Sequence, residues 1–261
     1  MSSRQGRKAA ARQVRLAQEA QARAATARRR RFRALAGAVL AAVAVAAPVI
    51  AVSGGGSTYA VSGTKLSGVS FSSRLFAGIP QHGTVLGRPD APVRIIEFAD
   101  LQCPYCQEYA AQVLPSLVRD YVRTGKAQME FENLSFIGPD SVQAGHVAAA
   151  AAAQNKLWNF VDLMYLNQGT ENTGYVTSSY LRRLLRAIPG LNVAAALSTS
   201  QTRAADAALT EANQLAVKNG VNGTPSFLIG HIKGPLRQFQ PPTLTAAPFA
   251  AALTSLMVGS R

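Results

Sequence analysis

Cysteine is almost absent from this sequence of 261 residues, which contains only two. Histidine is also scarce, and the three histidines share no metal-ligand spacing. With two cysteines and no histidine pair, the chain cannot supply the four ligands of a structural zinc site. The sequence also lacks an internal repeat of fixed period, which is the mark of repeat architectures. A zinc module and a repeat protein are therefore excluded.

Acidic residues are few, 13 against 27 basic ones, but the imbalance belongs to one end of the chain. Residues 1–33 contain eleven Lys and Arg and one acidic residue, so they carry +10 of the formal net charge of +14. The remaining 228 residues contain 16 basic and 12 acidic residues. The arginines of the tail do not alternate with aromatic residues, as they do in proteins that bind single-stranded nucleic acid. We therefore expect a basic cytoplasmic tail and no nucleic-acid partner.

An uninterrupted apolar segment follows the tail. Residues 34–52 contain no charged side chain, and a helix of this length can cross a hydrocarbon core about 30 Å thick. Positive charge before the segment, and none close after it, places the N-terminus in the cytoplasm and the rest of the chain outside. We therefore predict a transmembrane signal-anchor at 34–52, in a single-pass protein of the cell membrane whose globular domain is extracytoplasmic.

Cleavage of this segment is the alternative. Ala44-Val45-Ala46 matches the small-residue pattern of a signal-peptide cleavage site, and Arg29-Arg30-Arg31-Phe32 resembles a twin-arginine signal. The long basic tail favours the uncleaved anchor, because signal peptides usually begin with a shorter charged region. A Gly- and Ser-rich flexible linker is predicted at 53–74, followed by a globular domain at 75–261.

Strand and helix patterns alternate within this domain. Val93–Ala99 is an apolar, β-branched run short enough for a central strand buried on both faces. The next helix is predicted from the cysteines to about Arg123, with a kink at Pro115. The order of elements predicts an α/β fold with a partly parallel sheet and a helical insertion at about 140–218. Further strands are expected at 82–86, 128–136, 226–229 and 236–240, and further helices at 141–167, 178–187, 200–219 and 243–257.

The two cysteines form one C-x-x-C motif, Cys103-Pro104-Tyr105-Cys106. Cys103 lies where a helix begins after a strand, so unpaired N–H groups and the helix dipole should stabilise its thiolate. A lowered pKa makes Cys103 the nucleophile, while Cys106, one turn later, suits the resolving role. Pro104 fits the first helical position, which needs no N–H. The motif therefore predicts thiol–disulfide exchange.

Glu97 and Pro225 are further candidate site residues. An acid inside an apolar central strand is costly unless it is paired or protonated, and Glu97 lies six residues before Cys103. Two interpretations stay open: a buried proton shuttle with a raised pKa, or a carboxylate that reaches solvent at the strand end. Pro225 precedes a predicted strand, and trans is the commoner form of such a bond. Asp100 is expected to be a loop or cap residue.

Together these segments resemble a known family. The stretch Glu97–Cys106, and the stretch Val221–Phe227 with its Gly-Thr-Pro, are similar to the DsbA-like branch of the thioredoxin superfamily, in its membrane-anchored bacterial form. The resemblance implies a thioredoxin fold with an inserted helical subdomain over about residues 75–258. It also implies a cis Pro225 opposite the cysteine pair, and it matches Glu97 to the family's buried acid.

The function implied by the resemblance is an extracytoplasmic thiol–disulfide oxidoreductase that oxidises dithiols in exported proteins. A substrate thiolate attacks Cys103, a mixed disulfide forms, and a second substrate thiol resolves it. The residues expected to contact substrate are Pro104, Tyr105, Thr224 and Pro225. No metal or organic cofactor is expected, and a quinone-linked membrane partner would reoxidise the pair.

Two alternative functions stay open. One is a reductase or isomerase of the same fold, and the other is a non-catalytic binding or chaperone module with a structural disulfide. The chain has Pro-Tyr between its cysteines, where strongly oxidising members of the family have Pro-His. The redox potential of the pair separates an oxidase from a reductase, and a permanently oxidised, inaccessible pair would indicate the binding module.

Overall fold

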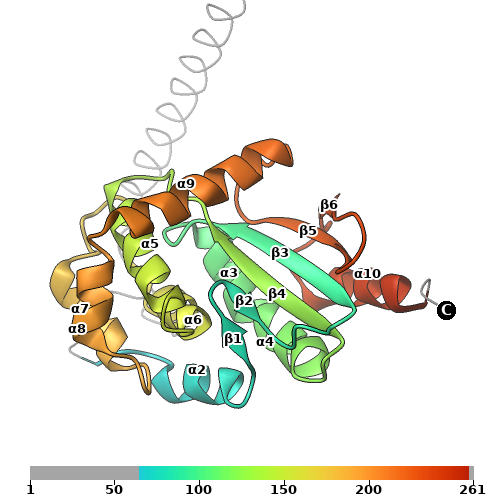
Figure 1. The fold of residues 1–261 in the computed structure, drawn as a ribbon, viewed down its shortest axis with the longest axis horizontal. Helices are drawn as coiled ribbons and strands as arrows, with labels where there is room; N and C mark the ends of the chain where they lie inside the picture. The colour runs from blue at the N-terminus through green and yellow to red at the C-terminus, as the bar shows by residue number, and fades with distance from the viewer. Residues whose placement is uncertain (1–64, 259–261) are drawn as a thin grey trace, which may run out of the picture. The chain divides into compact units, whose positions relative to one another are not determined.

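The computed structural model describes residues 65–258, which form a six-stranded mixed sheet with helices on both faces (Figure 1). The strands run in the order β1-β2-β4-β3-β5-β6. They are β1 Gln81–His82, β2 Val85–Leu86, β3 Val93–Ala99, β4 Ala127–Asn133, β5 Ser226–His231 and β6 Arg237–Phe239. The helices are α2 Val69–Phe76, α3 Pro104–Gln112, α4 Leu114–Leu117, the π-helical turn η1 Val118–Val122, α5 Pro139–Ala152, α6 Leu157–Leu166, α7 Ser178–Arg186, α8 Val193–Thr199, α9 Arg203–Lys218 and α10 Ala246–Val258.

Strand β3 is central because both of its edges are paired. It runs parallel to β4, with Ala99 opposite Asn133, and antiparallel to β5, with Phe98 opposite Ser226. The C-terminal ends of β3 and β4 therefore lie at the same edge of the sheet as the N-terminal end of β5. Three loops converge at this edge. The predicted strand at 93–99 and the partly parallel sheet are confirmed.

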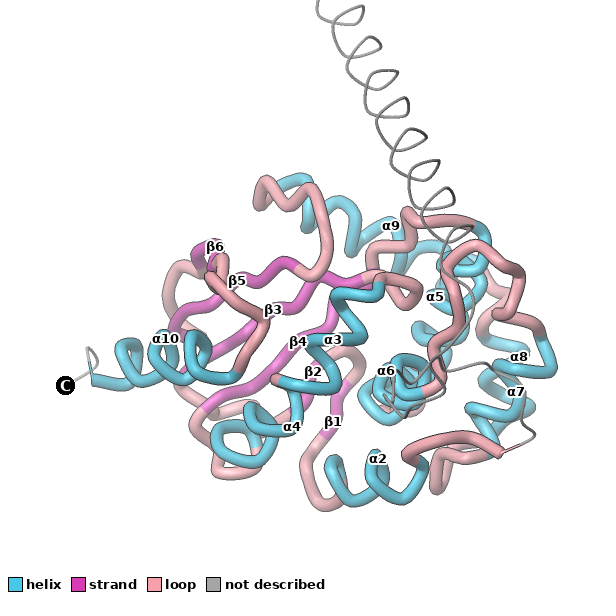
Figure 2. The backbone as a smooth tube through the Cα atoms, turned by 180° about the vertical axis from the view of Figure 1, so that it is seen from behind, coloured by secondary structure: helices cyan, strands magenta, loops and turns pink. Residues whose placement is uncertain are grey.

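Side chains of β3 alternate between two faces that different helices cover. Ile95 belongs to the larger core, to which α3, α4 and α10 contribute, and these helices lie in front of the sheet in Figure 2. Ile96 packs on the opposite face against Ala212 and Ala216 of α9, which crosses the sheet in Figure 1. Glu97, two residues after Ile95, shares the face that α3 covers.

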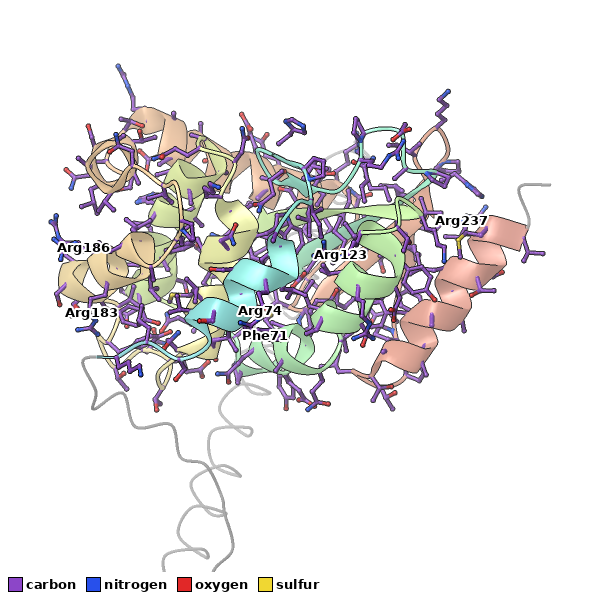
Figure 3. All side chains as sticks on the ribbon, turned by 90° about the horizontal axis from the view of Figure 1, so that it is seen from below. Phe71, Arg74, Arg123, Arg183, Arg186 and Arg237 are labelled. Carbon is purple, nitrogen blue, oxygen red and sulfur yellow. The ribbon has the colours of Figure 1, made fainter. Side chains whose placement is uncertain are left out.

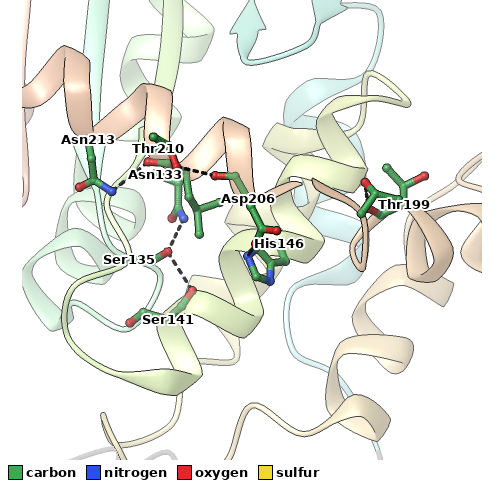
Figure 4. Close-up of polar contacts among 10 residues, drawn as sticks. Asn133, Ser135, Ser141, His146, Thr199, Asp206, Thr210 and Asn213 are labelled. Carbon is green, nitrogen blue, oxygen red and sulfur yellow. Dashed lines mark hydrogen bonds and ion pairs between the residues drawn. The ribbon is translucent and has the colours of Figure 1, made fainter. Parts of the chain in front are cut away.

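Helices α5 to α9 are inserted between β4 and β5, so the predicted helical insertion is confirmed. Helix α6 is buried along almost its whole length and packs against α2, α3, α5 and α7. Helix α9 returns to the sheet, and a polar contact of 2.9 Å between His146 Nε2 of α5 and Asp206 Oδ1 joins it to α5 (Figure 4). The first and last helices of the insertion therefore contact each other, and α9 also contacts β4.

The helix after the cysteines is broken near Pro115, as predicted. Helix α3 ends at Gln112, Val113 has φ −111°, and α4 begins at Leu114. A proline ring removes one backbone donor and clashes with the preceding turn, which accounts for the break. The break separates α3, which carries the cysteines, from the rest of the segment.

Part of the predicted linker is folded. Helix α2 begins within the predicted range 53–74 and continues past it to Phe76, and its residues Ser72 and Phe76 are buried. Arg123 donates from its guanidinium to the carbonyls of Leu75 at 2.8 Å and Ala77 at 2.9 Å, and Figure 3 shows it beside α2. The prediction that order begins near Leu75 is wrong, because tertiary packing holds a segment too short to show helical periodicity.

Two other predicted elements are divided. The strand predicted at 82–86 is the hairpin β1–β2, because Gly83 adopts φ +60° and reverses the chain. The helix predicted at 141–167 is split into α5 and α6, with Asn155 between them at φ +56°. The Asn155 side chain accepts a hydrogen bond from the Gly83 N–H, at 3.0 Å, so the two turns support each other. Helix α8 was not predicted.

Among the helices of residues 65–258, none has the length and apolar character required to span a bilayer. The basic tail predicted at 1–33, the anchor predicted at 34–52 and the first part of the linker, 53–64, lie outside the described residues.

Candidate active site

Cys103 is the N-cap residue of α3. Its backbone is extended, with φ −68° and ψ 121°, and the Cys106 N–H donates to its Sγ at 3.4 Å. Pro104 occupies the first turn, as predicted. The cap position places the sulfur beside the unpaired N–H groups of the helix start. Cys103 is 4% exposed, Cys106 is fully buried, and both are free thiols.

The surroundings shift the pKa values of the two thiols in opposite directions. Hydrogen bonding with the thiol of Cys106 is the main cause that lowers the pKa of Cys103 to about 6. Burial opposes this shift, and contacts with Thr224 and with the backbone N–H groups of Cys106 and Tyr105 assist it. Burial raises the pKa of Cys106, and the neighbouring Cys103 raises it further. At neutral pH Cys103 is therefore mainly a thiolate and Cys106 a thiol, which favours their predicted roles as nucleophile and resolver.

The loop before β5 brings Pro225 to the cysteines. The Thr224–Pro225 peptide bond is cis, as the resemblance implies. The Cys103 sulfur lies 3.5 Å from the Thr224 carbonyl oxygen, so the two loops meet at the edge of the sheet. Tyr105 is 63% exposed and Pro104 is exposed beside it. Residues expected to contact substrate therefore surround the reactive sulfur.

Glu97 is enclosed by the sheet beneath these loops. It is 2% exposed and pairs in register with Phe131 of β4 and Phe227 of β5, so the interpretation as a solvent-reaching carboxylate is wrong. Burial, and then the charge of Cys103, raises the pKa of Glu97 to about 8. The carboxyl group is therefore protonated at neutral pH. When Glu97 is ionised, its charge raises the pKa of Cys106. A neutral buried acid at this position is able to donate a proton.

Asp100 holds the loop between β3 and α3. Its Oδ1 accepts from the Gln102 N–H at 2.8 Å and from the Ser141 hydroxyl at 2.6 Å. Its Oδ2 accepts from the N–H groups of Phe136 and Ile137, both at 3.0 Å. One buried carboxylate thus joins the loop after β3 to the loop after β4, which agrees with the expected role as a loop residue.

Two residues of the insertion reach the same loop, and sequence analysis assigned neither a role. Gln168 Nε2 donates to the carbonyls of Leu101 at 3.0 Å and Cys103 at 3.3 Å. The Tyr165 hydroxyl donates to the Asp100 carbonyl at 3.1 Å. The inserted helices therefore hold the backbone of the nucleophile in place. The pair of amide residues Asn167-Gln168 directly after an apolar helix was the available signal for Gln168.

Replacing Gln168 by leucine should lower stability and raise the pKa of Cys103 above its wild-type value of about 6. The substitution leaves the buried Leu101 carbonyl without a donor, at a cost of about 1–3 kcal/mol. The Cys103 carbonyl keeps its hydrogen bond from the Gln107 N–H but loses the one from Gln168, which frees the N-cap geometry that stabilises the thiolate. Ultraviolet absorbance of the thiolate as a function of pH measures the pKa, and chemical denaturation measures the stability.

Gln154→Leu is the matched control. Gln154 bridges two helical segments far from the cysteines, with one hydrogen bond to and one from the backbone of Asn192, at 3.0 Å and 2.8 Å. Its loss should lower stability and leave the pKa of Cys103 unchanged. An unchanged pKa in Gln168→Leu as well would show that Gln168 supports the fold without tuning the thiol.

The histidines and Trp158 take no part in this site. His146 pairs with Asp206, and Trp158 is buried in the core with its Nε1 donating to the Thr84 carbonyl at 3.0 Å. Within residues 65–258 no three His, Cys, Asp or Glu side chains are grouped in a way that would hold a metal ion.

Comparison with known proteins places this geometry in a family. The family model described as Thioredoxin matches residues 81–238. The probable disulfide bond formation protein D of Bacillus cereus is 31% identical over 154 residues, which are 58% of this chain and 71% of the relative. The crystal structure of oxidised BdbD from Bacillus subtilis superimposes with a TM-score of 0.59 at 19% identity, covering 69% of this chain and 98% of that structure. The crystal structure of α-DsbA1 from Wolbachia pipientis also superimposes with a TM-score of 0.59 at 19% identity, covering 68% of this chain and 94% of that structure.

The matched region contains the central strand, the C-x-x-C motif, the inserted helices and the cis-proline loop. The structural neighbours share the fold, and the Bacillus relative shares enough of its sequence and length to establish kinship. This chain belongs to the thioredoxin family and is a DsbA-like thiol:disulfide oxidoreductase.

Proposed function

We propose that this enzyme oxidises dithiols in exported proteins, with Cys103 and Cys106 as its redox pair. The low pKa of Cys103 carries the proposal. A thiolate that the native fold stabilises favours the reduced enzyme, and this makes the disulfide form the stronger oxidant. The value of about 6 lies between those of thioredoxin, about 7, and of the strong oxidant DsbA, about 3.5.

The reaction begins from the enzyme with Cys103 and Cys106 joined as a disulfide. A substrate thiolate attacks Cys103 Sγ, the bond to Cys106 breaks, and its electron pair leaves with the Cys106 sulfur. Glu97, neutral up to pH about 8, donates the proton that this sulfur takes up. A second substrate thiolate then attacks the substrate sulfur of the mixed disulfide and releases Cys103 as a thiolate. The substrate gains a disulfide, and the enzyme retains two electrons.

Four residues form the contact surface for substrate in this proposal. Pro104 and Tyr105 are exposed on the helix start, and Thr224 and Pro225 lie across from them. The Thr224 carbonyl already lies 3.5 Å from the Cys103 sulfur. An extended substrate segment that follows this loop would bring its own cysteine to the same point.

The cellular setting rests on the sequence. Residues 1–33 form the cytoplasmic tail, 34–52 anchor the chain, and the catalytic domain lies outside, tethered by the residues that precede α2. A quinone-linked membrane protein accepts the electrons and restores the disulfide. Protease added to the outside of intact cells tests this placement, because it should digest the catalytic domain and spare the tail.

The equilibrium redox potential of the pair tests the direction of electron flow. We expect a value between about −270 mV and about −120 mV, more oxidising than thioredoxin, for the full chain equilibrated with glutathione in detergent. A potential at or below that of thioredoxin would favour the reductase or isomerase. Cysteines that stay oxidised and resist mild reductant would favour the binding module.

A further inference from the structure

Two hollows flank the beginning of α3 on the side of the inserted helices. The first, about 340 Å³ in volume, lies between α3 and α6. The second, about 390 Å³, extends toward the loop after α6. Pro104 and Gln107 line both hollows, so the two are neighbours and begin at the residue that follows Cys103. A polypeptide whose cysteine reaches Cys103 passes close to them.

The charged side chains of these hollows all have one sign. Glu108 and Asp162 line the first hollow, Glu171 lines the second, and no Lys, Arg or His among the described residues lines either. Arginines gather elsewhere, as Figure 3 shows for Arg183 and Arg186 of α7. The surface beside the nucleophile is therefore acidic, although basic residues outnumber acidic ones by 27 to 13 in the whole chain.

Asp162 is the buried member of this set. It is 1% exposed on α6, and its Oδ2 has no hydrogen-bond partner among the described residues. Burial raises the pKa of Asp162 to about 6, and the Ser72 hydroxyl is the group that opposes this rise. At neutral pH the carboxylate is therefore mostly ionised without a cation beside it. A buried charge without a partner is costly, and an arriving cation removes that cost.

The other walls of the first hollow are largely apolar. Ala110, Ala111 and Leu166 line it together with Pro104 and Tyr165. A hollow with apolar walls and one buried carboxylate fits a side chain that has an aliphatic stem and a cationic tip. Lysine and arginine have this form, whereas an acidic side chain would be repelled and an apolar one would leave the carboxylate unpaired.

We propose that the hollow between α3 and α6 is a subsite for a Lys or Arg side chain of the polypeptide substrate, which pairs with Asp162 while the substrate cysteine reacts at Cys103. The inference rests on the proposed oxidation of protein dithiols and adds a preference to it. Substrates with a basic residue a few positions from the reacting cysteine are oxidised faster than substrates without one.

A peptide series measures this preference. Each peptide carries two cysteines and, at one position near the reacting cysteine, Lys, Arg, norleucine or Glu, and kcat/KM for oxidation is measured with the full chain in detergent. At the position that reaches the hollow, Lys and Arg should exceed norleucine by about tenfold, the factor expected for one charge-assisted contact, and Glu should be slowest. Asp162→Asn should bring the Lys-to-norleucine ratio close to one.

Two further variants make the test specific. Ala111→Phe fills the hollow without a change of charge and should remove the same preference. Glu132→Gln replaces a half-buried carboxylate whose neighbours are Glu130 and Glu211, and it should keep the preference. A ratio near one in the wild type, or a preference that survives both Asp162→Asn and Ala111→Phe, overturns the subsite and leaves the proposed function standing. Failure to oxidise any peptide overturns the proposed function and the subsite with it.

Discussion

Replacing Cys103 by serine should abolish the oxidation of a reduced, unfolded protein. The hydroxyl of serine is not ionised at neutral pH and forms no disulfide, whereas the pKa of Cys103 is about 6. Since every step of the proposed exchange passes through this sulfur, the rate should fall by about three orders of magnitude or more, to the uncatalysed level. Loss of free thiols from the substrate, followed over time, measures the rate.

Cys106→Ser is the informative companion variant. It retains the Cys103 thiolate, which attacks a substrate disulfide and releases one substrate thiolate, but no second enzyme thiol remains to resolve the bond. A mixed disulfide should therefore accumulate and be visible on a non-reducing gel. Undiminished oxidation by Cys103→Ser would contradict the thiol mechanism. If Cys103→Ser instead formed mixed disulfides through Cys106, then Cys106 would be the nucleophile and Cys103 the resolving cysteine.

The features that sequence predicted well are those encoded by neighbouring residues. The cysteine pair can be recognised from its three-residue spacing and its position at a helix start. Strand β3 can be recognised from one apolar run. The break at Pro115 follows from the chemistry of a single ring. The cis bond before Pro225 came from resemblance, because an isolated X–Pro sequence favours the trans form.

The features that sequence missed depend on partners far along the chain. Gln168 donates to Cys103, 65 residues earlier, and Asp100 accepts from Ser141, 41 residues later. No local period marks such pairs, since each residue taken alone is an ordinary polar side chain. Asn155 illustrates the same limit for the backbone, because its left-handed conformation is stabilised by the distant Gly83. The long-range bonds of Gln168 and Asp100 hold the loop of the nucleophile, so the reactivity of the motif depends on more than its four residues.

Replacing Glu97 by glutamine should stabilise the enzyme at neutral and alkaline pH. Burial raises the pKa of Glu97 from 4.5 to about 8, so the folded protein holds this proton more tightly than the unfolded chain does. Below pH 4.5 the carboxyl is protonated in both states, and its contribution to stability is intact. As the pH rises through about 8 the contribution is lost, up to a limit of about 5 kcal/mol. Glutamine does not ionise, so chemical denaturation should show a gain that is small at pH 5 and larger at pH 8.

The same substitution should slow oxidation, because the departing Cys106 sulfur loses its proton donor. A fall of about a hundredfold is the scale expected for a general acid. Glu132→Gln is the matched control, since burial and the charge of Glu130 also raise the pKa of Glu132 to about 8, but Glu132 lies on the other face of the sheet from the cysteines. Its gain in stability over the wild type should also grow with rising pH, while its rate of oxidation stays that of the wild type. A Glu97→Gln enzyme that oxidises substrate as fast as the wild type would show that solvent protonates Cys106 and that the buried carboxyl serves the reaction in no direct way.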